Sequence, residues 1–240
     1  MKLDILAIAA HPDDVELSAS GTLLRSVEQG KKVGVLDLTR GELGTRGNAE
    51  TRAEEARRAT EILKLSIREN VGLPDGFLNN EKEQQLAIIP YIRKFRPDIV
   101  LTNSVKDRHP DHGMAAALVS KTCFLSGLRA ISTNDESGKN QEAWRPRAVY
   151  HFIQDRYLQP DFVVDISNQW PQKMEAIKAF SSQFFTGFDD NEPATPISTP
   201  EFIKFLEARA REFGRLINVE FGEGFIADRS IGIRDLNHLL

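Results

Sequence analysis

The sequence predicts an α/β fold in which helices flank a mostly parallel sheet. Strand-like and helix-like segments alternate through the first half of the chain, an order typical of parallel sheets with right-handed crossovers. The first strand-like run is apolar almost throughout, as in a central strand covered on both faces. No repeat, low-complexity stretch or linker interrupts the chain, so we expect a single, doubly wound domain over residues 1–240.

The elements of the first half follow from hydrophobic period and from glycine. Residues 3–9, LDILAIA, predict a buried strand, and a helical stripe of leucines follows from 15 to about 29, where Gly30 ends it. Thr51 and Glu54 have capping-box spacing, which predicts the start of a charged surface helix. The other elements expected here are a strand at 32–39, a glycine-rich loop at 40–48, a helix at 52–65, a strand at 69–74, a helix at 82–95, a strand at 98–103 and a helix at 110–126.

The second half contains two long polar segments, 131–147 and 186–200. We expect both to be loops, because neither has the apolar pattern of a packed element. The elements expected around them are strands at 148–153 and 161–166, helices at 171–184 and 201–217, and a final segment of strand and loop at 222–236.

The composition excludes several classes of function. A net charge of −4 argues against a general nucleic-acid binder, which would carry a basic excess. The apolar N-terminal run contains Asp4, is too short to span a membrane and lacks the features of a signal peptide, so we expect a cytoplasmic protein without a membrane partner. Cys123 is the single cysteine, which rules out an intramolecular disulfide, and its apolar surroundings predict a buried side chain rather than a nucleophile.

Two corners of the predicted fold carry the same motif, His-Pro-Asp, between a strand and an apolar helix. The first corner is His11 to Asp14 (HPDD), and the second is His109 to His112 (HPDH). Proline is favoured at the first position of a helix, which would make each first histidine a cap. A helix start without further function would explain the prolines and aspartates. It explains poorly why histidine should be the cap, and still less why a cation should lie in the first turn, where it opposes the helix dipole.

The topology supplies a functional interpretation of the corners. Ligands of an open parallel sheet bind outside the carboxyl ends of its strands, and both corners occupy that edge. Two imidazoles and one carboxylate are a common ligand set for catalytic zinc with a position open for water. Neighbours on a helix point about 100° apart, so one of Asp13 and Asp14 can face the metal while the other takes the water's proton. In the second corner one histidine would ligate, and the other would stabilise an oxyanion as an imidazolium whose pKa Asp111 raises.

Several stretches of the chain resemble the LmbE-like (PIG-L-type) family of N-acetylglucosaminyl deacetylases. AHPDDVE (10–16) and RHPDH (108–112) are similar to its two His-Pro-Asp motifs, and LTRGELGTRGNAETRAEEARRA (38–59) is similar to its glycine-rich second motif. GLPDG (72–76) and DRSIGIRDL (228–236) resemble the branch that deacetylates N-acetylglucosaminyl malate in bacillithiol biosynthesis. The resemblance covers nearly the whole chain and implies a single-domain, Rossmann-like fold.

The resemblance also implies a metal ion and a role for each charged residue of the corners. The ion would be Zn²⁺, although a site of two histidines and one aspartate also accepts another divalent ion such as Fe²⁺. The implied assignments are His11, Asp14 and His112 as metal ligands, Asp13 as general base, and His109, with Asp111 behind it, as the group that polarises the carbonyl oxygen and donates a proton.

Other residues are similar to substrate-binding positions of the family. Arg52 matches an arginine of the substrate pocket, and Arg108 suits bidentate binding of a substrate carboxylate. The alternatives are a solvated helix charge for Arg52 and a surface ion pair for Arg108. Gly41 and Glu42 either shape the pocket or form a plain turn. No tyrosine follows Tyr157 to take the oxyanion role of a late tyrosine in some relatives.

The implied reaction is metal-dependent hydrolysis of the N-acetyl group of a small-molecule amino-sugar conjugate, N-acetylglucosaminyl malate first among them. Alternatives are an inositol glycoside, a lipid-linked sugar or a chitooligosaccharide, and the resemblance implies a homo-oligomer, a trimer or hexamer. A non-catalytic nucleotide-binding module has no motif support, because the first strand is not followed by G-x-G-x-x-G and no G-x-x-x-x-G-K-[ST] occurs. A structural zinc site would need cysteine-rich ligands that one cysteine cannot supply.

Overall fold

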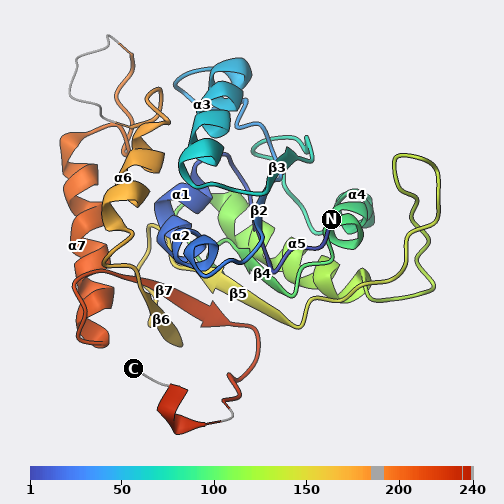
Figure 1. The fold of residues 1–240 in the computed structure, drawn as a ribbon. Coiled ribbons are helices and arrows are strands. Elements are labelled where there is room, and N and C mark those ends of the chain that lie inside the picture. Colours follow the sequence, from blue (N-terminus) through green and yellow to red (C-terminus); the bar gives the residue numbers. More distant parts are fainter. Residues whose placement is uncertain (185–191, 234, 239–240) are drawn as a thin grey trace.

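The computed structural model describes residues 1–184, 192–233 and 235–238, and it has a central sheet with helices on both faces (Figure 1). The α/β class predicted from the sequence is therefore confirmed. The strands are β1 (Ile5–Ala9), β2 (Val33–Asp37), β3 (Ile67–Asn70), β4 (Ile99–Thr102), β5 (Ala148–Phe152), β6 (Phe162–Asp165) and β7 (Gly222–Ala227).

Within the described residues, seven strands form one sheet in the order β3-β2-β1-β4-β5-β7-β6. Strands β1 to β5 run parallel, whereas β7 lies antiparallel between β5 and β6. β1 pairs with β2 on one side and with β4 on the other, so the strand order reverses between β1 and β4. The two His-Pro-Asp corners follow these two strands and therefore meet at the switch point of the sheet.

The helices agree best with prediction where a strong apolar period or a proline marks them. Those expected at 82–95, 110–126 and 201–217 are confirmed, with each end within one residue. The helices are α1 (Asp14–Ser18), α2 (Ser20–Glu28), α3 (Ala49–Ile62), α4 (Lys82–Phe95), α5 (Pro110–Leu125), α6 (Trp170–Lys178) and α7 (Pro200–Leu216), with a short 3-10 helix, η1 (Leu236–His238).

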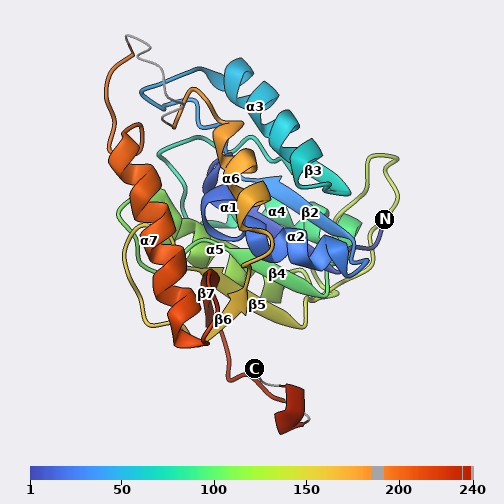
Figure 2. The same ribbon diagram turned by 60° about the vertical axis from the view of Figure 1, so that its left-hand side comes forward.

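Helices cover both faces of the sheet, which explains why β1 is apolar at every position. Leu6 and Ile8 pack with α4 and α5 on one face, whereas Ile5, Ala7 and Ala9 pack with α1 and α2 on the other. Burial of each large side chain of this kind contributes about 1.5–3 kcal/mol. α6 packs outside α1 and α2, and α7 lies against β7 on the same side of the molecule (Figure 2).

The single helix expected from 15 to about 29 is wrong, because the chain breaks at Ala19 into α1 and α2. The break exposes the backbone N–H groups of Gly21 and Thr22, which donate to the carboxylate of Glu223 at 2.9 and 2.7 Å. Glu223 belongs to β7 and is buried, so a residue from the far end of the chain determines where α2 begins.

The start of α3 also differs from prediction. Asn48 is the N-cap, and its side chain accepts from the N–H of Thr51 at 2.8 Å, so the predicted capping box of Thr51 and Glu54 does not form. The helix α6 ends six residues before the predicted 184, because the chain turns after it, and β3 begins before the predicted 69. The predicted loop at 186–200 lies partly outside the described residues.

Two further expectations concern the core and the membrane. Cys123 lies on α5, is 3% exposed and packs in the apolar core, which confirms its prediction as a buried side chain. None of the helices in the described part of the chain combines the length and the apolar character needed to cross a bilayer.

Candidate active site

The two His-Pro-Asp corners have different backbones although they share a motif. At the second corner α5 begins with Pro110, and His109 is its N-cap, with Nδ1 accepting from the N–H of Asp111 at 3.2 Å. At the first corner the predicted cap is wrong, because α1 begins only at Asp14 and the preceding Asp13 has φ 111°. A positive φ is uncommon for a residue with a side chain, and such strain, of about 1–3 kcal/mol, clusters at functional sites.

Side chains from both corners converge on Asp14. Its Oδ2 lies 3.5 Å from Nδ1 of His11, and its Oδ1 lies 3.2 Å from Nε2 of His112. The ring of His109 lies beside them, with its centroid 4.7 Å from that of His11 and 5.0 Å from that of His112. The structure thus brings the three predicted metal ligands together and places the fourth predicted residue next to them.

Two overlapping donor sets lie at the same place. Ring nitrogens of His11, His109 and His112 lie within 4.8 Å of one another, and so do His11 and carboxylate oxygens of Asp75 and Asp111. Both sets contain His11 and the first also contains His112, so they overlap the predicted ligand set, whereas Asp14 belongs to neither. Imidazole nitrogen and carboxylate oxygen together fit zinc or another divalent transition metal.

Each predicted histidine ligand also has a carboxylate on its second ring nitrogen. Nδ1 of His112 lies 2.5 Å from Oδ2 of Asp107, and Nε2 of His11 lies 3.0 Å from Oδ1 of Asp75. Burial alone would lower the pKa of His112, but the neighbouring carboxylates of Asp14 and Asp107 raise it to about 9. Metal-ligating histidines usually have such partners, which orient the ring. The sequence analysis missed both aspartates, although Asp75 lies within GLPDG and Asp107 directly precedes RHPDH.

The Asp14 carboxylate is held by two amide side chains that sequence analysis also missed. Asn103, after β4, donates from Nδ2 to Oδ2 at 2.9 Å, and Gln154, after β5, donates from Nε2 to Oδ1 at 2.8 Å. The backbone N–H of His11 adds a third bond at 3.0 Å. Burial would raise the pKa of Asp14, but His112 and His11 lower it well below its usual value. The only sequence signal for these amides is their position at the carboxyl ends of neighbouring strands.

Arg52 is buried against the first corner, so the alternative interpretation of this arginine as a solvated helix charge is wrong. Its Nη2 donates to Oδ2 of Asp13 at 2.8 Å and to the carbonyl of Pro12, and its Nη1 lies 3.5 Å from the carbonyl of Gly41. Burial raises the pKa of Asp13 to about 7, although the Arg52 charge acts in the opposite direction. A guanidinium therefore holds the strained aspartate in place.

The glycine-rich loop shapes the site rather than forming a plain turn. Gly41 has φ +65°, and a Cβ there would collide with the guanidinium of Arg52, so a larger residue would displace the arginine. Glu42 accepts from the N–H of Asp75 at 3.0 Å, and the N–H of Leu43 donates to the Asp75 carboxylate at 2.9 Å. The loop consequently holds the carboxylate that contacts His11.

A pocket of about 340 Å³ opens above these residues. Its lining includes His11, Asp13 and Asp14, together with largely apolar side chains of α7 that form one wall, called the α7 wall. Arg108 also lines the pocket. It makes the surface ion pair that was the alternative to substrate binding, with its Nε 3.4 Å from Oδ2 of Asp155. The site therefore combines polar groups at the switch point with room for a small molecule.

A model of the GlcNAc-PI de-N-acetylase (PIG-L) family matches residues 6–123. The diacetylchitobiose deacetylase of Thermococcus kodakarensis is 30% identical over 191 residues, which cover 75% of this chain and 70% of that relative. The chain belongs to the PIG-L family. It is accordingly a metal-dependent N-deacetylase that acts on N-acetylglucosaminyl compounds.

Two other proteins extend the comparison of this PIG-L deacetylase. The probable N-acetyl-α-D-glucosaminyl L-malate deacetylase 2 of Bacillus anthracis is 24% identical over 216 residues, covering 85% of this chain and 91% of that protein. The crystal structure of the conserved protein TT1542 from Thermus thermophilus superimposes with a TM-score of 0.83 and 34% identity, covering 97% of this chain and 98% of that one. The LmbE-like fold therefore extends over nearly the whole chain.

The surroundings of His109 in this PIG-L deacetylase differ from expectation. The Asp111 carboxylate accepts from the N–H of Gly76 at 2.8 Å and lies 3.5 Å from Nε2 of His11. Burial lowers the pKa of His109, and His11 and His112 lower it further, against the charges of Asp14 and Asp111. The raised pKa expected from Asp111 is thus not observed, because Asp111 faces His11 and the other two histidines act in the opposite direction.

Proposed function

We propose that the chain is a single-domain, zinc-dependent hydrolase that removes the acetyl group from an N-acetylglucosaminyl conjugate at this site. In this proposal His11, Asp14 and His112 hold the metal ion. The observation that carries it is the convergence of two ring nitrogens on the two oxygens of Asp14, at 3.5 and 3.2 Å. Two histidines and one carboxylate leave a coordination position for water, as catalytic zinc sites do.

The proposed roles of the remaining residues follow from their contacts. A zinc ion held by these residues would lower the pKa of a bound water towards about 7 and polarise a carbonyl oxygen. Asp13 takes the proton of the attacking water, and its ion pair with Arg52 keeps the carboxylate beside Asp14. His109 donates a hydrogen bond to the oxyanion and relays to the departing amine the proton that Asp13 has taken from the water. Asp111 positions His11 and the turn at Gly76.

We further propose that the substrate is N-acetylglucosaminyl malate, as in bacillithiol biosynthesis. Its two carboxylates need cationic partners, and Arg108 presents a half-exposed guanidinium to the pocket. The malate deacetylase of Bacillus anthracis, matched over 91% of its length, supports the same substrate. The cytoplasmic location expected from the hydropathy of the sequence, and a trimeric or hexameric assembly implied by the family resemblance, complete the proposal.

Diacetylchitobiose is the second candidate substrate. The relative from Thermococcus kodakarensis, which is 30% identical, is named for it. The aromatic side chains Phe202, Phe205 and Phe213 of the α7 wall could stack on a second sugar ring.

The test is acetate release from each glycoside by the purified protein, before and after treatment with a chelator. We expect release from the malate glycoside, its loss on metal removal, and its recovery with added Zn²⁺. Recovery with Fe²⁺ alone would overturn the choice of zinc. Release that resists chelation would contradict the metal-dependent mechanism, and faster release from diacetylchitobiose would favour the second substrate.

A further inference from the structure

The α7 wall of the pocket carries one buried cation among apolar side chains. Residues of α7 that line the pocket recur at intervals of three or four, as expected for one face of a helix. They are Phe202, Phe205, Leu206, Arg209, Ala210 and Phe213. Arg209 is the charged residue among these six.

Arg209 is held in place but keeps hydrogen-bond donors for a ligand. Its Nη1 donates to the carbonyl of Gln154 at 2.8 Å, and its Nη2 donates to the carbonyl of Asp155 at 2.9 Å. Each terminal nitrogen of a guanidinium has two N–H groups, so a second one remains on each. A carboxylate in the pocket could accept from these remaining donors.

Glu212 supplies the carboxylate that pairs with Arg209 in the described part of the chain. Its Oε2 lies 3.7 Å from Nε of Arg209, which is too long for a hydrogen bond, and the Glu212 side chain is half-exposed. The Arg209 side chain is itself only 12% exposed, and its guanidinium lies 5.0 Å from the ring centre of Phe205 and 5.7 Å from those of Tyr157 and Phe213. The aromatic rings and the two backbone carbonyls stabilise this charge, and an anion bound in the pocket would stabilise it further.

Arg108 supplies a second cation next to Asp155, the residue whose carbonyl accepts from Arg209. Its Nε lies 3.4 Å from the Asp155 carboxylate, while Arg209 donates to the Asp155 carbonyl. Both arginines line the pocket, as do His11, Asp14 and His112. Two guanidinium groups that flank one residue match the two carboxylates of a short dicarboxylic acid better than they match a neutral sugar.

We propose that Arg209 is a specificity-determining residue that binds a carboxylate of the aglycone, with Arg108 as its partner for the second carboxylate. The substrate class is thus an N-acetylglucosaminide that carries a dicarboxylate. This inference rests on the proposed deacetylase function and names a recognition residue that the two His-Pro-Asp motifs do not contain.

The experiment compares kcat/KM for N-acetylglucosaminyl malate with kcat/KM for methyl N-acetylglucosaminide. We expect the wild-type protein to prefer the malate glycoside and Arg209→Met to reduce that preference by about 10- to 100-fold, the range for losing a hydrogen-bonded charge. The loss should be mainly in KM. Arg211→Met is the matched control, because Arg211 lies on the same helix, is half-exposed and pairs with Glu207 and Glu220 on the surface. It should leave the preference unchanged.

Other outcomes separate this inference from the function on which it rests. An equal loss with both substrates in Arg209→Met would mean that Arg209 acts only through Gln154 and would overturn the inference. A wild-type protein that deacetylates both glycosides without preference would overturn it as well, while leaving the deacetylase function intact. Absence of acetate from both substrates, with metal bound, would contradict the proposed function itself.

Discussion

The two His-Pro-Asp corners share three residues and both follow a parallel strand of the sheet, yet their backbones differ. At the second corner the proline starts α5, so His112 lies within the first turn of a regular helix. At the first corner α1 starts later, and Asp13 adopts a positive φ that leaves Asp14 at the helix start. The difference lets the fourth residues of the two motifs face each other across 3.2 Å. A repeated motif therefore need not mean a repeated geometry.

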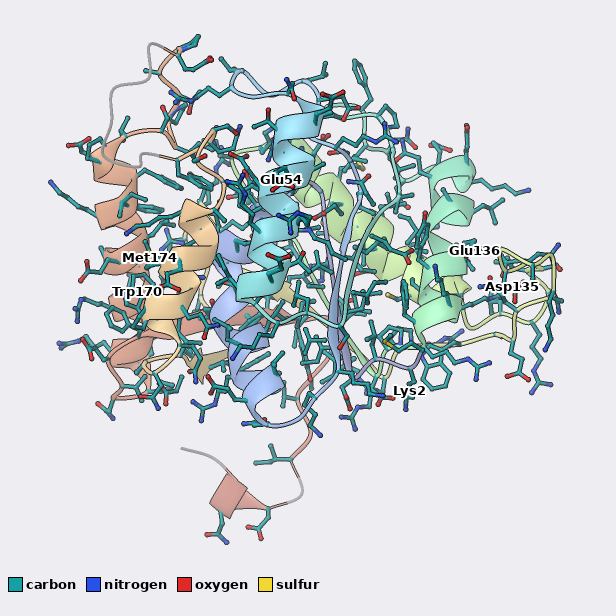
Figure 3. The ribbon with its side chains drawn as sticks, turned by 45° about the horizontal axis from the view of Figure 1, so that its top comes forward. Lys2, Glu54, Asp135, Glu136, Trp170 and Met174 are labelled. Carbon is teal, nitrogen blue, oxygen red and sulfur yellow. The ribbon has the colours of Figure 1, made fainter. Side chains whose placement is uncertain are left out.

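The fourth positions, Asp14 and His112, should give the largest effect when changed. Asp14→Ala or His112→Ala should lose bound metal, measured by emission spectrometry, and lower acetate release by more than about 1,000-fold, which exceeds the roughly 10- to 100-fold cost of losing a partner of a ligand. Asp135→Ala is a suitable control, because Asp135 lies on an exposed loop far from α6 and α7 (Figure 3). Full metal content in either variant would contradict the ligand assignment.

The third positions, Asp13 and Asp111, should separate chemistry from positioning. Asp13→Asn should retain metal but lower kcat by about 10²- to 10⁴-fold, because an amide cannot take a proton yet still accepts from Arg52. Asp111→Asn should cost only about 10- to 100-fold, because its contacts are to Gly76 and His11. Steady-state kinetics with metal analysis measures both. Equal losses in the two variants would remove the distinction between the corners.

Much of the fold could be predicted because it depends on local pattern. Continuous apolar residues predicted β1, and the period of α4 predicted both of its ends. The break at Ala19 could not be predicted, because it depends on Glu223, which is 202 positions from Gly21 in the sequence. The order of the strands also resisted derivation, since β7 inserts between β5 and β6 through long-range pairing.

The candidate site divides in the same way. The histidines and aspartates of the two motifs were singled out because their residue types are unusual at helix starts. Asn103 and Gln154 were missed, because an isolated amide after a strand has no chemical signature until its partner Asp14 is seen 89 or 140 positions away. Arg209 was missed for the same reason, since its helix period resembles that of any packed surface helix.

Variants of His109, the first residue of the second motif, test whether helix capping or chemistry explains the histidine at that position. Asn is a good N-cap and Ala is a poor one, so His109→Ala should lower the free energy of unfolding by about 1 kcal/mol relative to His109→Asn. Both variants should lose oxyanion stabilisation equally, with kcat falling about 10²- to 10³-fold. Urea unfolding and acetate release measure the two quantities separately. Recovery of activity in His109→Asn would mean that this histidine serves as a helix cap, and the second corner would then contribute to the reaction only through His112 and Asp111.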